Sequence, residues 1–175
     1  RTTAIHPYNT TMYKRLENYE ALGFDTFLYE DTMANTAKLD TNPYISDAAA
    51  YAEITAILKA SAEKDFIHLV TMQNHTPYQD KYTATPSAAE TGIVSQSIRN
   101  YLQDLQYSDQ ALAELLATLQ EWDEPTIVVF CGDHWPSVFG EELYALNTLQ
   151  NMHETPLFIY SNTQEVHKDL GVTSP

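Results

Sequence analysis

The sequence predicts an α/β fold in which a mostly parallel, mixed sheet carries helices on both faces. Short apolar, strand-like runs alternate with helical stretches along the 175 residues, an order typical of parallel sheets with helical crossovers. The run Thr126–Cys131 is apolar or β-branched throughout, is too short for a free-standing helix, and is bracketed by Pro125 and Gly132. Such a run predicts a strand buried on both faces, in the middle of the sheet.

The N-terminal half supplies the remaining predicted parallel strands. Strands are expected where apolar or β-branched residues cluster, over residues 2–5, 24–29 and 66–72. A polar or helical stretch covers residues 8–22, and an alanine-rich helix runs from Ala48 to about Ala62 with Asp47 as a plausible N-cap. The loop between these elements, residues 30–47, is rich in Asp, Asn and Thr and contains the turn signal Asn42-Pro43.

A long helix over residues 92–122 is predicted between a polar loop at 79–91 and the apolar run described above. Its apolar residues follow helical spacing and form one stripe: Ile98, Leu102, Leu105, Leu112, Leu115, Leu116 and Leu119. Asp109 falls within that stripe, so we expect it to be substantially buried with hydrogen-bond partners. A short helix near 141–149, a strand at 156–160 and a polar tail from Asn162 complete the chain.

Composition restricts the classes of function. A net charge of −15 with only nine Lys and Arg argues against a nucleic-acid partner, because phosphate backbones require a basic face. The single cysteine, Cys131, excludes an internal disulfide. No apolar run approaches the roughly 18 residues of a membrane span. The chain opens at Arg1 in what reads as a strand already under way, so we expect a fragment of a longer protein.

Polar residues that suit a metal and an anion follow three of the predicted strands. Asp133 and His134 come after the run at 126–131 and would supply an oxygen and a nitrogen to a divalent cation. The alternative is that Asp133 caps a following helix and His134 is an ordinary surface histidine. His6 and His75 also follow strands, and parallel strands would bring all three histidines to one sheet edge. Together with Arg15, they predict a site for an anionic substrate and a metal.

Four motifs occur in a fixed order along the chain. They are His6-Pro7-Tyr8-Asn9 followed by Tyr13 and Arg15, Asn74-His75-Thr76-Pro77, Tyr107-Ser108-Asp109 on the long helix, and Gly132-Asp133-His134. In this order they resemble the sulfatase-like catalytic domain of lipoteichoic acid synthases, which belong with the phosphoglycerol and phosphoethanolamine transferases of the alkaline phosphatase superfamily. The resemblance implies that residues 1–175 are the C-terminal portion of an alkaline phosphatase/sulfatase-like domain, incomplete without its N-terminal portion and membrane helices.

The resemblance also implies roles for substrate-binding residues. His75 would contact the substrate phosphate and help to protonate the leaving group, which makes it the catalytic residue of this chain. His6 and Arg15 would bind the phosphate of a phosphoglycerol group, a task that suits the two-pronged guanidinium of arginine. Tyr13 would line the pocket where the synthases carry tryptophan, a departure that leaves the preference for glycerol phosphate open.

By the same resemblance, Asp133 and His134 would be two ligands of a catalytic ion, Mn²⁺ or Mg²⁺, or Ca²⁺ in a sulfatase. The family's nucleophilic threonine and its glutamate metal ligand lie N-terminal to the opening His6-Pro motif, and Thr10 and Thr11 do not match the nucleophile's position. We therefore expect the isolated chain to be inactive.

The intact protein is expected to transfer phosphoglycerol from a membrane lipid to a cell-envelope polymer through a metal-dependent covalent mechanism. Its partners would be an anionic phospholipid head group, a glycerol-phosphate polymer and the missing N-terminal half of the domain. It would be membrane-anchored and act at the extracellular face of the membrane, whereas this fragment alone would be soluble. Two alternatives remain: a sulfatase or phosphoethanolamine transferase on the same scaffold, or a non-catalytic binding fragment.

Overall fold

The computed structural model describes residues 1–173, which form two compact units. The first unit comprises residues 1–115 and the second begins at Leu116, so the division falls within the longest helix. The order of strands and helices, β1-α1-β2-α2-β3 followed by helices and two further strands, confirms the predicted α/β class.

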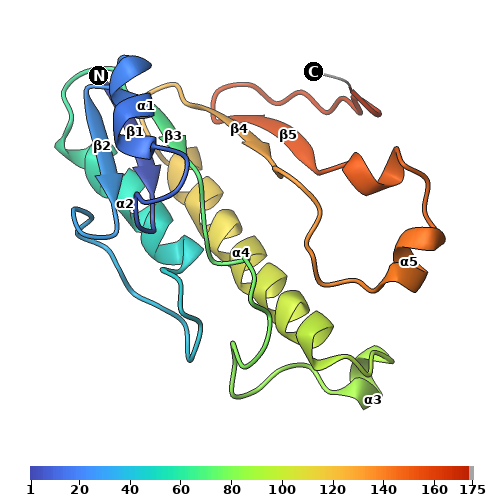
Figure 1. The fold of residues 1–175 in the computed structure, drawn as a ribbon. Coiled ribbons are helices and arrows are strands. Elements are labelled where there is room, and N and C mark those ends of the chain that lie inside the picture. The colour runs from blue at the N-terminus through green and yellow to red at the C-terminus, as the bar shows by residue number, and fades with distance from the viewer. Residues whose placement is uncertain (174–175) are drawn as a thin grey trace. The chain divides into compact units, whose positions relative to one another are not determined.

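The first unit is built on a parallel sheet of three strands in the order β2-β1-β3 (Figure 1). The central strand is β1, Thr2–His6, and its neighbours are β2, Thr26–Tyr29, and β3, Phe66–Leu69. Residues Thr3 to His6 of β1 are buried, as expected for a strand with a neighbour on each side. The predicted parallel pairing is therefore confirmed in this unit, although β3 is shorter than the run 66–72 suggested.

Helices cover both faces of this sheet. Tyr19 of α1, Arg15–Ala21, packs on Phe27 of β2 with ring centroids 4.6 Å apart. The second helix, α2, covers Asp47–Ala60, and its Ile57 lines a pocket together with Leu28 from the opposite face of β2. The predicted N-cap of α2 is wrong by one residue, because the side chain of Ser46 accepts the hydrogen bond from the Ala49 N–H.

The long helix α4 covers Gln96–Gln120 and is preceded by a short helix, α3, at Ala88–Thr91, within the stretch predicted as loop. The most buried positions of α4 follow helical spacing along one face and are Asn100, Gln103, Asp104, Ala111, Leu115 and Leu119. Asp109 is exposed, so its predicted burial is wrong, and the buried carboxylate of this helix is Asp104. Among residues 1–173, no helix combines the length and the apolar character of a membrane span.

The second unit contains a two-stranded antiparallel sheet of β4, Ile127–Cys131, and β5, Leu157–Ser161. Between them lie α5, Glu141–Ala145, and a 3₁₀ turn at Asn151–His153. One face of the sheet is partly covered: the rings of Phe130 and Phe158 stack with centroids 5.0 Å apart. Beside them, the Tyr160 hydroxyl donates to Gln120 Oε1 of α4 over 2.8 Å.

The prediction that β4 is buried on both faces is wrong for the described part of the chain. Ile127 is 71% exposed and Val129 is 64% exposed, and Cys131 is exposed as well. β4 has a single neighbouring strand among residues 1–173, and that strand is antiparallel. One face of this pair therefore presents exposed apolar side chains, although the sequence run has the composition of a central strand.

Candidate functional site

His6 ends β1 and lies almost fully buried at the carboxyl edge of the parallel sheet. Its Nδ1 lies 3.0 Å from the main-chain oxygen of Val70, which directly follows β3. Because a carbonyl oxygen can only accept, Nδ1 carries the hydrogen, and Nε2 of the neutral ring keeps a free lone pair. The neighbouring strand therefore fixes the orientation of the His6 ring and leaves Nε2 as its functional atom.

His75 lies beyond β3 in the segment Gln73–Tyr78, called the His75 segment below. Its main-chain N–H donates to the carbonyl of Met72 over 3.0 Å, which forms a tight turn after the strand. Its Nδ1 donates to the carbonyl of Thr76 over 2.8 Å. The ring is exposed, and Nε2 is again the nitrogen left free for chemistry. Since β1 and β3 are parallel neighbours, His6 and His75 follow the same edge of the sheet, as the sequence predicts.

A chain of aromatic rings connects the two histidines. His6 contacts Tyr8 edge-on with centroids 6.4 Å apart, Tyr8 contacts Tyr44 at 5.4 Å, and Tyr44 contacts His75 at 5.8 Å. The Tyr44 hydroxyl donates to the carbonyl of Thr76 over 2.5 Å and lies 3.5 Å from His75 Nδ1. Sequence reasoning missed both tyrosines as site residues. Tyr8 lies inside the His6 motif and Tyr44 follows the turn signal at Asn42-Pro43, but neither position indicated a ring contact.

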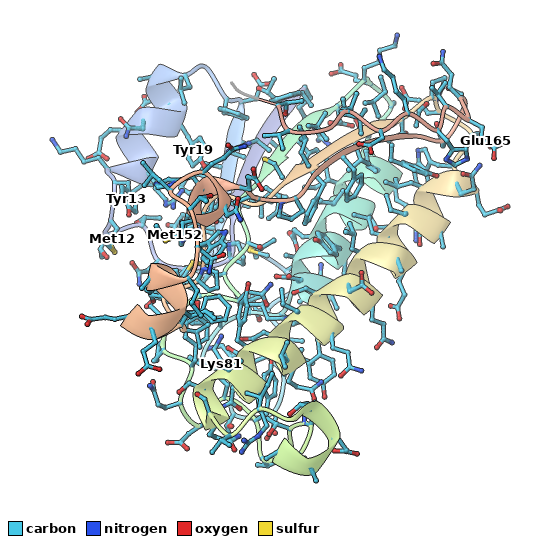
Figure 2. All side chains as sticks on the ribbon, turned by 90° about the vertical axis from the view of Figure 1, so that its right-hand side faces the viewer. Met12, Tyr13, Tyr19, Lys81, Met152 and Glu165 are labelled. Carbon is cyan, nitrogen blue, oxygen red and sulfur yellow. The ribbon has the colours of Figure 1, made fainter. Side chains whose placement is uncertain are left out.

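Arg15 begins α1 directly after two residues with unusual backbone angles. Tyr13 has φ 61° and Lys14 has φ 47°, the left-handed region that residues with a side chain seldom adopt. The side-chain amide of Asn18 donates to the Tyr13 carbonyl over 2.7 Å and so stabilises this turn. Tyr13, which lies beside Met12 near the start of α1, is 73% exposed, and the Arg15 guanidinium lies 5.4 Å from its ring centroid (Figure 2).

Burial and two neighbouring basic groups act on His6. Burial is the largest cause that lowers the pKa of His6, and the charges of Arg15 and His75 lower it further. The hydrogen bond to the Val70 carbonyl opposes this shift. His6 is therefore neutral at pH 7, whereas Arg15 supplies a permanent positive charge beside it. Within the first unit, Arg15 and His75 thus both act electrostatically on His6.

Asp133 and His134 lie in the second unit, in the loop that leaves β4. His134 Nδ1 donates to the carbonyl of Trp135 over 2.8 Å, so its Nε2 is free, and this atom lies 3.4 Å from Asp133 Oδ2. Both side chains are exposed. The loop is anchored where the Trp135 indole N–H donates to the carbonyl of Glu154 over 3.0 Å.

Gly132 is required by the close approach of this loop to the segment before β5. A Cβ at position 132 would lie 3.1 Å from the Cβ of Thr155, which is tighter than ordinary van der Waals contact. The Gly132 N–H donates to the carbonyl of Pro156 over 3.0 Å, which extends the pairing of β4 with β5 by one step. The glycine therefore lets the Asp133-His134 pair follow the strand end without a displacement of Thr155.

The donor set of this pair fits a divalent ion. An imidazole nitrogen and a carboxylate oxygen 3.4 Å apart are closer than twice a metal–ligand distance of about 2.1 Å, so one ion can contact both. The other nitrogen of His134 is held by a backbone carbonyl, as is usual for metal-binding histidines. Among residues 1–173, no group of three or more His, Cys, Asp or Glu side chains could hold a metal ion. The pair therefore fits as part of a metal site that needs further ligands.

The predicted site residues divide between the two units. His6, Tyr13, Arg15 and His75 belong to the first, and the predicted metal ligands belong to the second. Their meeting in one pocket therefore stays a prediction.

Comparison with known proteins identifies the class to which this fold and these motifs belong. The sulfatase family model matches residues 1–175, and the chain belongs to that family. The fold is that of the alkaline phosphatase superfamily, as the resemblance of the motifs implied.

Individual relatives include two curated proteins and a solved structure. The chain is 31% identical to the capsular polysaccharide biosynthesis protein RkpI of Rhizobium meliloti over 78% of its length, and 24% identical to lipoteichoic acid synthase 1 of Bacillus subtilis over 90%. The phosphoglycerol transferase GacH of Streptococcus pyogenes, solved with sn-glycerol-1-phosphate, matches 96% of the chain with 25% identity and a TM-score of 0.79. The chain spans 24% and 26% of the two curated relatives and 45% of the GacH chain.

Proposed function

We propose that these residues are part of a metal-dependent transferase that moves a phosphoglycerol group from an anionic membrane lipid to a cell-envelope polymer. The observation that carries the proposal is that His6 and His75 follow one edge of the parallel sheet and that Arg15 acts electrostatically on His6, in a chain whose net charge is −15. The permanent charge of Arg15, together with the two histidines, favours an anion against such a background. The similarity to GacH, which was solved with sn-glycerol-1-phosphate, supports phosphoglycerol as the anion.

Each group of the cluster has a distinct task in this proposal. The Arg15 guanidinium donates hydrogen bonds to the phosphate oxygens, and the ring face of Tyr13 contacts the guanidinium and holds it in place. His6 is neutral, so its Nε2 accepts a hydrogen bond from a hydroxyl of the glycerol group. The imidazolium form of His75 donates a proton from Nε2 to the departing oxygen, while its Nδ1–H stays bound to a backbone carbonyl.

Asp133 Oδ2 and His134 Nε2 would hold the divalent ion, Mn²⁺ or Mg²⁺, together with ligands from outside residues 1–173. When bound, this ion would supply positive charge for the attacking oxygen and the phosphoryl group. The nucleophile would also come from outside this chain, in the remainder of a longer catalytic domain. The intact protein would act at the extracellular face of the cell membrane, where lipid donor and polymer acceptor meet.

Binding of glycerol 1-phosphate to the full-length protein, measured by calorimetry, tests the anion site. Arg15→Ala should weaken binding at least tenfold, the loss of about one charge-assisted pair. Lys59→Ala is the matched control, because it removes one positive charge from an exposed position near the end of α2. Equal losses in the two variants would show that only net charge matters, and the proposal would then be wrong.

The same calorimetric binding measurement, made with different head groups, tests which group the site prefers. Glycerol 1-phosphate should bind more tightly than phosphoethanolamine or sulfate if the transferred group is phosphoglycerol. Preference for sulfate would support the sulfatase alternative, and preference for phosphoethanolamine the other transferase. Tyr13→Trp restores the residue that the synthases carry at this position, so its effect on the preference shows whether Tyr13 contributes to specificity.

A further inference from the structure

A buried polar network lies directly beneath the His75 segment. Gln73 is 1% exposed; its Oε1 accepts from the main-chain N–H of Asp47 over 2.9 Å, and its Nε2 donates to Ser108 Oγ and to the Asp104 carbonyl, both over 3.1 Å. Its own carbonyl accepts from Lys81 Nζ over 2.7 Å, and Lys81 lies beside the first half of α4 (Figure 2). The position of the segment therefore depends on α2, α4 and the loop that carries Lys81.

Ser108 is the node of this network. Its hydroxyl has one hydrogen to donate but lies within hydrogen-bond distance of three polar atoms. Its Oγ lies 2.5 Å from Asp47 Oδ2, 3.1 Å from Asn74 Oδ1 and 3.1 Å from Gln73 Nε2. The amide nitrogen of Gln73 can only donate, so it occupies one lone pair of the hydroxyl. Asp47 Oδ2 and Asn74 Oδ1 then compete for the single hydrogen of Ser108.

The protonation state of Asp47 decides this competition. When Asp47 is ionised, Ser108 donates to it, and Asn74 Oδ1 receives no hydrogen from Ser108. When Asp47 is protonated, its hydrogen goes to Ser108 Oγ, which is then free to donate to Asn74. The hydroxyl then uses both lone pairs and its hydrogen, and Asn74, the residue before His75, is tied to α4.

We propose that Asp47 and Ser108 form a proton-dependent relay that positions the His75 segment through Asn74, an inference that rests on the proposed role of His75 at the phosphate site. The relay is assembled when Asp47 holds a proton and released when it loses one. Asp47 and Ser108 touch neither substrate nor metal, so they are positioning residues. The geometry around His75 then depends on pH through the carboxyl group of Asp47, which does not contact the substrate phosphate.

The surroundings of Asp47 place this change in a mildly acidic range. The pKa of Asp47 is raised to about 6. Burial is the largest cause and the nearby charge of Asp104 acts in the same direction, while the hydrogen bond from Ser108 and the charge of Lys81 oppose the shift. On α2 itself, burial and Asp47 raise the pKa of Tyr51, so that phenol stays neutral. Asp47 Oδ1 is buried without a hydrogen-bond partner among the described residues, which also disfavours the ionised form.

Nuclear magnetic resonance tests the relay directly. In full-length protein labelled with ¹⁵N at asparagine, the side-chain amide of Asn74 should shift with pH and show a midpoint near 6. Asp47→Asn should abolish that titration, because the new amide donates to Ser108 at every pH, and Ser108→Ala should abolish it by removing the node. A flat Asn74 signal in the wild type would overturn the proposal, and so would an unchanged titration in either variant.

A binding measurement provides the functional readout. The affinity for glycerol 1-phosphate should change several-fold between pH 5.5 and 7.0 in a way that Asp47→Asn removes; the ionisation of the ligand is common to all variants and cancels in their ratio. Glu53→Gln is the matched control, since Glu53 is a buried carboxylate of the same helix that accepts from the N–H groups of Ala34 and Asn35. It should keep the wild-type pH profile.

The two proposals fail in different ways. If the wild type binds no glycerol 1-phosphate at any pH while Asn74 still titrates near pH 6, the proposed function is wrong and the relay stands as a structural device. If the wild type binds the ligand but Asp47→Asn keeps the wild-type pH profile, the relay is wrong and the phosphate site stands.

Discussion

Removing the charge of Asp104 should be the most destabilising single change in the first unit. Asp104 and Lys81 are both fully buried, with Lys81 Nζ 2.6 Å from Asp104 Oδ2. Burial raises the pKa of Asp104 and lowers the pKa of Lys81, and the contact between them opposes both shifts. In Asp104→Asn the amide oxygen can still accept from Tyr82 and Asn42, so the main loss is the partner of a buried ammonium group. Such a loss costs about 3–5 kcal/mol of unfolding free energy.

The control lies on the same helix. Asp109→Asn makes the identical chemical change at an exposed position and should alter the unfolding free energy by less than about 0.5 kcal/mol. Urea denaturation of the full-length protein, followed by circular dichroism, measures both variants. Adding Lys81→Met to Asp104→Asn should recover part of the loss, because no unpaired charge then remains buried. Equal stability of the two single variants would refute the assignment of Asp104 as a buried ion-pair partner.

Three further predictions concern pH, metal and the isolated chain. The fold raises the pKa of Asp47 from 3.8 to about 6, so the wild type should lose about 3 kcal/mol of unfolding free energy as pH rises through this range. Asp47→Asn should not show this loss, and urea titrations of both proteins at several pH values check it. In the full-length protein, Asp133→Ala or His134→Ala should abolish turnover and Mn²⁺ binding, whereas His68→Ala should leave both unchanged, as calorimetry and an activity assay would show. Residues 1–175 alone should bind Mn²⁺ weakly and release no diacylglycerol from phosphatidylglycerol, because only two ligands converge within the described residues 1–173. Metal-dependent turnover by this chain would contradict that expectation.

The parallel sheet of the first unit was predictable because its strands are short apolar runs separated by helices and turns. The position of a residue just beyond such a strand also fixes the sheet edge where it lies, which is why His6 and His75 could be placed together from the sequence. The run at 126–131 has the same composition, but its burial depends on which strands and layers cover it. Composition does not contain that information, so the exposure of Ile127 and Val129 was missed.

The long helix shows a second limit. Its leucines define an apolar stripe towards the C-terminal half, where Leu115 and Leu119 are buried. Towards the N-terminal half the buried face is polar, with Asn100 and Asp104 at 0% exposure. A search for apolar periodicity therefore places Asp109 inside the stripe, whereas the buried carboxylate precedes it by more than one helical turn.

Tyr44 was missed for a related reason. It lies in a loop between β2 and α2, far from His75 in sequence, and its contacts with Tyr8, His75 and the Thr76 carbonyl arise only when that loop folds over the sheet edge. Among 12 tyrosines, nothing in the local pattern distinguishes the one that supports the candidate site. Site residues that act through tertiary packing leave no periodic signal in the sequence.

We propose that the carboxyl edge of the parallel sheet, where His6 and His75 lie, binds the phosphoglycerol group that the intact protein would transfer. The most direct measurement is the release of diacylglycerol from labelled phosphatidylglycerol by the full-length protein with Mn²⁺, compared between wild type, His75→Ala and His68→Ala. We predict metal-dependent release that falls at least a hundredfold in His75→Ala, the typical contribution of a general acid, and is unchanged in His68→Ala. Release that is equally fast in His75→Ala and wild type would contradict the account.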